Sequence, residues 1–76
     1  MEHEPIVYCI RVSVHLDVGW SEWFERMEIT YAKNGDTLLT GPIKDQAMLY
    51  GVLMKLHNLG LPLISVMPAQ STVEED

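Results

Sequence analysis

The pattern of apolar and polar residues over residues 38–67 predicts a strand, a turn, an amphipathic helix that ends at a glycine, and a second strand. The helix is expected to begin near Asp45, whose carboxylate suits the N-cap, with Pro42 at a first helical position as the alternative start. Its core stripe repeats every three or four residues: Leu49, Val52, Leu53, Leu56 and Leu59. Gly60 suits the left-handed position that ends a helix. Residues 61–67 are almost continuously apolar, which predicts a central strand buried on both faces.

Three strands are predicted upstream of the helix, and the last of them is the strand that opens residues 38–67. Residues 6–16 alternate, and one set, almost purely apolar, is expected to face the core: Ile6, Tyr8, Ile10, Val12, Val14 and Leu16. Residues 27–32 form the next strand, and Asn34-Gly35 predicts a type I′ hairpin turn. The partner strand is expected at residues 37–40, where Gly41-Pro42 ends it.

Three aromatic residues lie between the first two strands. Trp20, Trp23 and Phe24 have the spacing of one helical face, so a short helix is predicted over residues 20–26. An aromatic plug that closes a small core is favoured over an aromatic ligand box.

This order of elements predicts an α+β fold, a reduced ferredoxin-like sandwich of the form β-short α-β-β-α-β. Its four-stranded antiparallel sheet would have the first and last strands at its centre and one long and one short helix on one face. The alternative is an antiparallel meander crossed by the long helix, with residues 20–26 as a loop. Residues 6–67 are expected to form a single domain between a polar leader, residues 1–5, and a flexible acidic tail, residues 68–76.

Composition narrows the class of protein. With 76 residues, 47% hydrophobic and 21% charged, the chain is globular, and so small a core favours association with a second copy. The net charge of −6 argues against nucleic-acid binding. Cys9 is the only cysteine and no signal peptide is recognised, so a reducing, cytoplasmic location is expected. The apolar runs are too short to span a membrane.

Five short segments carry a resemblance to a known family. They are His-Leu-Asp at residues 15–17, Trp-Ser-Glu-Trp-Phe at 20–24, Leu-Thr-Gly-Pro at 39–42, Asp-Gln-Ala at 45–47 and Leu-Gly-Leu-Pro-Leu-Ile-Ser-Val at 59–66. With them the chain resembles a family of small, uncharacterised prokaryotic proteins (hypothetical proteins) over about residues 6–67. The resemblance implies a cytoplasmic protein and no particular activity. The topology is also similar to small regulatory domains of the ACT type, which is an analogy of fold alone.

Candidate chemistry gathers near the end of the first strand. His15 and Asp17 are the candidates for a catalytic pair, a base oriented by a carboxylate, although a histidine beside an acidic turn is the favoured interpretation because no nucleophile accompanies it. The candidate ligand-binding residues are Arg11, Ser13, His15, Trp20 and Trp23. Cys9 is interpreted as a small buried residue, since the strand rise puts it roughly 20 Å from His15. The spacings predict no metal and no cofactor.

Apolar residues in excess of the core stripe predict an interface. The candidates are Met48, Tyr50 and Met54 on the helix and Leu63 and Met67 on the last strand. The alternative is that they are the scattered exposed apolar residues found on every surface. We therefore expect a non-catalytic homodimeric module for protein interaction or small-ligand sensing, with no nucleic-acid or membrane partner. A small enzyme or accessory subunit that uses His15 and Asp17 near residues 20–24 is the alternative.

Overall fold

The computed structural model describes residues 5–69 of the chain. Its elements are strand β1 (Ile6–Val12), the 3₁₀ helix η1 (Val18–Glu22), strands β2 (Glu28–Tyr31) and β3 (Thr37–Ile43), helix α1 (Gln46–Asn58) and strand β4 (Leu63–Pro68). Most of the predicted leader and tail, residues 1–4 and 70–76, lies outside the described residues.

The four strands form one antiparallel sheet in the order β2-β3-β1-β4. The fold class is therefore α+β, as predicted. The prediction that the last strand is central was wrong, because the β2–β3 hairpin inserts β3 beside β1 and leaves β4 at an edge. The apolar run of β4 is not a sign of double burial, since Leu63, Ile64 and Met67 are all exposed.

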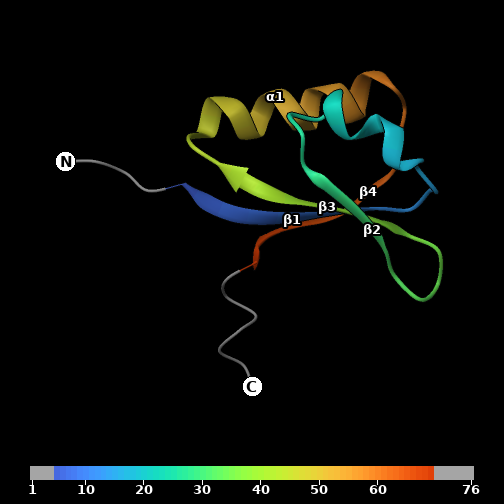
Figure 1. Cartoon of the computed structure of the whole chain (residues 1–76). Coiled ribbons are helices and arrows are strands. Elements are labelled where there is room, and N and C mark those ends of the chain that lie inside the picture. Colours follow the sequence, from blue (N-terminus) through green and yellow to red (C-terminus); the bar gives the residue numbers. More distant parts are fainter. Residues whose placement is uncertain (1–4, 70–76) are drawn as a thin grey trace.

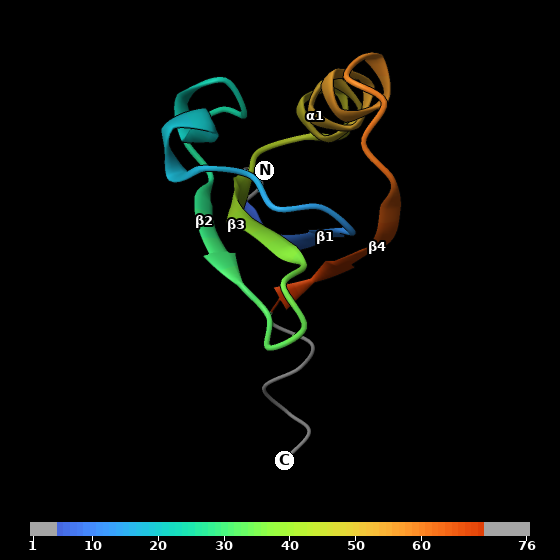
Figure 2. The same ribbon diagram turned by 90° about the vertical axis from the view of Figure 1, so that its right-hand side faces the viewer.

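Helix α1 and η1 lie on the same face of the sheet, α1 over the β1–β4 half and η1 over β2 (Figures 1 and 2). The core fills the space beneath them, and Val66 of β4 packs against it, partly buried. The buried members of the core are Ile10, Val12, Leu16, Phe24, Met27, Ile29, Leu39, Ile43, Leu49, Val52 and Leu56. No described element covers the opposite face of the sheet. Val7, Cys9 and Leu38 lie there and are half-buried by their neighbours.

Strand β1 is shorter than the alternation predicts. It ends at Val12, although Leu16 is still buried in the core. Beyond Val12 the backbone bonds to the side chain of Thr37, whose hydroxyl donates to the Val14 carbonyl at 2.6 Å and accepts from the Leu16 N–H at 2.9 Å. A buried threonine thus replaces the ladder partner that would have continued the strand.

The β2–β3 hairpin forms as predicted, with a different turn. Gly35 has φ +95° and Asn34 does not have a positive φ, so the type I′ prediction was wrong. The Gly35 N–H donates to the Ala32 carbonyl at 3.0 Å and the Ala32 N–H to the Asp36 carbonyl at 2.9 Å. This is the bonding of a three-residue hairpin loop in which a left-handed glycine follows the turn.

Strand β3 continues through Gly41 and Pro42, where the sequence predicted its end. Pro42 is tolerated because the β2 ladder stops at Thr40, so one flank of β3 is free beyond that residue. Gly41 is buried against Met27, and a Cβ atom at residue 41 would lie 3.3 Å from the Met27 Cα. The glycine permits this close approach of the backbones.

The short helix predicted over residues 20–26 is not formed there. A 3₁₀ helix at Val18–Glu22 takes its place, and Glu25 and Arg26 have positive φ angles of 57° and 62°, which turn the chain into β2. Of the three aromatic residues of the predicted plug, Phe24 is fully buried whereas Trp20 and Trp23 are exposed.

Helix α1 begins and ends as predicted. The Asp45 carboxylate accepts from the Met48 N–H at 2.9 Å. Gly60, with φ +74°, closes the helix by donating to the His57 carbonyl, and the Leu61 N–H donates to the Leu56 carbonyl. These two bonds form a Schellman motif. The core stripe is right except for Leu59, which is exposed.

Candidate functional site

His15 and Asp17 lie on the loop that follows β1, and the structure does not pair them. His15 is exposed, and its ring stacks on that of Tyr31 with centroids 4.6 Å apart and an interplanar angle of 12°. The Tyr31 hydroxyl donates to the Leu16 carbonyl at 2.6 Å, which fixes the ring beneath the histidine. Among residues 5–69 the Asp17 carboxylate has no hydrogen-bond partner. The geometry of a carboxylate-oriented base is thus absent from the described part of the chain.

Arg11 lies on the open face of the sheet and holds the hairpin loop. Its Nε donates to the Asp36 carboxylate at 2.8 Å and its Nη2 to the Asn34 side-chain oxygen at 3.4 Å. The hydrogen bond from Arg11 lowers the pKa of Asp36; partial burial opposes this shift, and Asn34 adds to it. Ser13 is exposed, and its N–H donates to the Pro62 carbonyl at 3.0 Å. The side chain of Arg11 therefore stabilises the hairpin loop, whereas Ser13 contributes a backbone hydrogen bond.

The two tryptophans lie on the surface beside α1. The Lys55 ammonium group lies 5.2 Å from the centroid of the Trp23 ring and donates to the Trp23 carbonyl at 2.8 Å. It also forms an ion pair with Glu25 at 3.0 Å. Lys55 thereby ties the helix to the turn that holds two left-handed residues. Trp20 is tilted by 37° against the buried Phe24, at a centroid distance of 6.3 Å.

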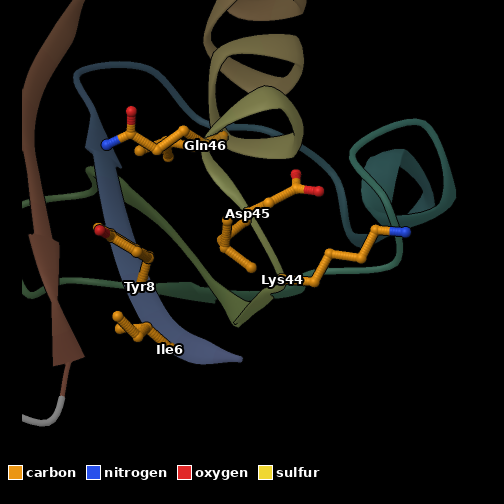
Figure 3. Close-up of a pocket in the computed structure, with 7 residues that line it drawn as sticks. Ile6, Tyr8, Lys44, Asp45 and Gln46 are labelled. Carbon is orange, nitrogen blue, oxygen red and sulfur yellow. The ribbon is translucent and has the colours of Figure 1, made fainter. Parts of the chain in front are cut away.

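A cavity of about 370 Å³ lies where the first turn of α1 faces the start of β1. Apolar side chains line most of it; its polar groups come from Tyr8 on β1 and from three consecutive residues, 44–46, that lead from the end of β3 into the first residue of α1. The lining residues are Ile6, Tyr8, Ile43, Lys44, Asp45, Gln46 and Leu49. In Figure 3 the Tyr8 hydroxyl and the Gln46 carboxamide point to the same side, whereas the Lys44 ammonium group and the Asp45 carboxylate point to the other.

The second cavity is a more open hollow of about 560 Å³ on the side of α1 that faces η1. It shares Lys44 and Asp45 with the first cavity and is otherwise lined by Glu25, Ala47, Met48 and Gly51. None of the predicted ligand-binding residues lines either cavity. Sequence reasoning missed Tyr8, Lys44 and Gln46; the one available signal was the polar run of residues 44–46 between two apolar elements.

The five interface candidates fall into two groups. Tyr50 and Met54 lie one turn apart on the outside of α1 and are exposed, while Met48 packs against the core. Leu63 and Met67 are exposed on the edge strand β4. Sequence reasoning missed a sixth residue, Ile64, which is 50% exposed on the same strand.

Cys9 lies on the open face of the sheet and is half-buried, with the Thr40 hydroxyl 3.7 Å from its sulfur. Within residues 5–69, histidine, cysteine, aspartate and glutamate side chains nowhere gather in a group of three that could hold a metal ion. No helix in the same part of the chain is long and apolar enough to cross a membrane.

A family model described as a domain of unknown function (DUF8691) matches residues 7–67, which include every strand and helix except the first residue of β1 and the last of β4. No curated protein and no solved structure matches the chain.

Proposed function

We propose that this chain, which belongs to the DUF8691 family of domains of unknown function, is a non-catalytic module that forms a homodimer through β4. The observation that carries the proposal is the position and composition of this strand. It lies at the edge of the sheet, and Leu63, Ile64 and Met67 expose apolar side chains along it.

Edge strands of proteins that stay monomeric are usually protected by charges, by inward-pointing lysines or by a covering loop. Strand β4 has no charged residue, and its only polar side chain is that of Ser65. Pro62 and Pro68 limit pairing at the two ends. The backbone of residues 63–67 pairs with β1 on one side only, within the part of the chain that the structure describes.

A two-fold axis near Ser65 suits this strand. Two copies of β4 paired antiparallel about that axis would bring Leu63 of one copy opposite Met67 of the other and extend the sheet to eight strands. Both backbone hydrogen bonds and apolar burial would then contribute to association.

Charge also favours this edge. The chain has a net charge of −6, so two copies repel each other unless they meet away from their carboxylates. Strands β1 and β4 contain no acidic residue, whereas Glu28 and Asp36 lie in β2 and the hairpin loop at the other side of the sheet. Among residues 5–69, the β4 edge is therefore the side of the sheet with the fewer acidic residues.

Two finer features belong to the same proposal. A reduced ferredoxin-like topology is supported by the strand order β2-β3-β1-β4 and by the two connections that lie on one face. A cytoplasmic location is supported by the single cysteine, Cys9, whose thiol is free. The alternative of an enzyme built on His15 and Asp17 has no comparable support, because His15 stacks on Tyr31 and lines neither cavity.

Sedimentation velocity of Ile64→Lys against Val18→Lys tests the proposal. Both variants replace an exposed β-branched side chain, 50% exposed in Ile64 and 60% in Val18. Val18 begins η1, which lies on the other side of the molecule from β4 in Figure 2. The interface is small, so the wild-type chain and Val18→Lys should dimerise between about 5 and 500 μM, while Ile64→Lys should stay monomeric. A monomeric wild-type chain at about 500 μM, or equal loss of dimer in both variants, would contradict the proposal.

A further inference from the structure

The cavity of about 370 Å³ between β1 and α1 has the composition of a small-molecule site. Its floor consists of the side chains of Ile6, Ile43 and Leu49, of which Ile43 and Leu49 are buried members of the core. The volume lies in the range of about 300–1,000 Å³ that is usual for small-molecule sites. Protein sites for such molecules combine apolar walls with a few polar groups that fix orientation.

Two polar side chains at this cavity have no hydrogen-bond partner among the described residues. Within residues 5–69 neither the Tyr8 hydroxyl nor the Gln46 carboxamide takes part in a hydrogen bond; Tyr8 is half-buried and Gln46 is exposed, so water reaches both groups and a ligand would replace it. Both point to the same side of the cavity in Figure 3, and they come from residues 38 positions apart in the sequence. A hydroxyl and a carboxamide each donate and accept, so together they match a ligand group that does both.

The two charged side chains of the lining, Lys44 and Asp45, do not point to the side of the cavity where the Tyr8 hydroxyl and the Gln46 carboxamide lie. The Asp45 carboxylate caps α1 by accepting from the Met48 N–H, and the Lys44 ammonium group points away from Tyr8. The carboxylate occupies the N-terminus of the helix, where an anion would otherwise be favoured. An ion placed over the apolar floor on the Tyr8 side would lose part of its hydration, and neither charged side chain points toward it there.

We propose that this cavity binds an uncharged molecule with a ring-sized apolar body and one group, an amide or a hydroxyl, that bonds to Tyr8 and Gln46. The apolar body lies on Ile6, Ile43 and Leu49. This inference does not depend on the proposed dimer, because no residue of β4 lines the cavity.

Three probes of nearly the same shape test the proposal: benzamide, benzoate and benzamidinium, which are neutral, anionic and cationic at pH 7. Amide chemical shifts of the uniformly ¹⁵N-labelled full-length chain are followed during titration with each probe. Benzamide should shift the resonances of residues 6–8 and 43–49, with a Kd of about 1 mM for so small a molecule. The two ions should bind at least about tenfold more weakly, because they must give up their hydration.

Two variants test the polar contacts. Tyr8→Phe and Gln46→Ala should each weaken benzamide binding by roughly three- to tenfold, the usual effect of one hydrogen bond. Tyr50→Phe removes the same hydroxyl from an exposed tyrosine outside the cavity and should bind benzamide as the wild-type chain does. Ile64→Lys should also bind it normally, whether or not that variant dimerises.

Each of three results would overturn the proposal. The first is the absence of localised shifts with benzamide. The second is benzoate or benzamidinium binding as tightly as benzamide, and the third is unchanged affinity in both Tyr8→Phe and Gln46→Ala. Preserved amide spectra of the variants confirm that the fold is retained.

Discussion

Substitution by alanine should change the free energy of unfolding in opposite directions at two glycines, Gly51 inside helix α1 and Gly60 just beyond its end. Gly51 lies within the helix, is exposed, and a Cβ atom built on it would meet nothing within 4 Å. Gly60 lies just beyond the helix with φ +74°, and a Cβ atom there also meets nothing within 4 Å. Because neither substitution causes a steric clash with a neighbour, the difference between them isolates the backbone conformation.

The magnitudes follow from the two conformations. Alanine is favoured over glycine in a helix interior by about 0.8–1.0 kcal/mol, so Gly51→Ala should raise the free energy of unfolding by about 1 kcal/mol. In a domain of this length that gain corresponds to a rise of about 4–8 °C in Tm. At Gly60 a left-handed alanine costs about 1–2 kcal/mol, and the lower entropy of its unfolded chain offsets about 0.4–1 kcal/mol. Gly60→Ala should therefore lower the free energy of unfolding by about 0.5–1 kcal/mol.

Urea denaturation followed by circular dichroism at fixed protein concentration measures both changes. An unchanged m-value shows that the unfolding reaction is the same in each variant. A destabilising Gly51→Ala would refute the reasoning, because it would mean that the space outside residue 51 is filled. Weaker dimerisation of Gly51→Ala would show that the face of α1 with Tyr50 and Met54, rather than β4, packs against the second copy.

Two further predictions concern carboxylates. Asp45→Ala should lower the free energy of unfolding by about 1 kcal/mol through loss of the cap on Met48, whereas Asp45→Asn should keep most of it, as urea denaturation would show. Asp36→Asn should be less stable than the wild-type chain at pH 7 because Arg11 favours the ionised carboxylate and lowers its pKa. That stability is present above the unfolded pKa and is lost as the pH falls through the folded one, so the difference should shrink below about pH 4. A difference that stays constant from pH 7 to pH 3 in denaturation experiments would contradict it.

The sequence predicted the start and end of helix α1 and the core face of β1 correctly. Asp45 at the N-cap and Gly60 at the end of the helix act on backbone groups within one turn, so the residue types alone were sufficient. The alternation in β1 identified Ile10 and Val12 as core residues for the same reason, since successive side chains point to opposite faces. The hairpin was also predicted, but its turn type depended on the φ angle of a single residue, Asn34.

The candidate site residues stay a prediction, and the structure gives several of them other contacts. The sequence pointed to residues 11–24, where Arg11 instead binds Asp36 and His15 stacks on Tyr31. Tyr8 was taken as a core residue because its strand alternates, yet its hydroxyl faces a cavity. The polar run of residues 44–46 was the only signal for Gln46, and no pattern in one strand shows which residue of a distant helix will lie beside it.

What the sequence by itself determined is the identity and approximate limits of the strands and of α1, because turns, caps and periodicity act between residues close in the chain. Only the tertiary structure decided that β3 lies beside β1, that β4 is an edge and that a cavity opens beneath the first turn of α1. These features depend on which distant segments pair. A run of apolar residues such as residues 61–67 can form an edge strand with exposed side chains as well as a buried central strand. The physical reason is that an apolar pattern shows which side chains favour burial away from water, whereas the segment that buries them depends on the topology of the whole chain.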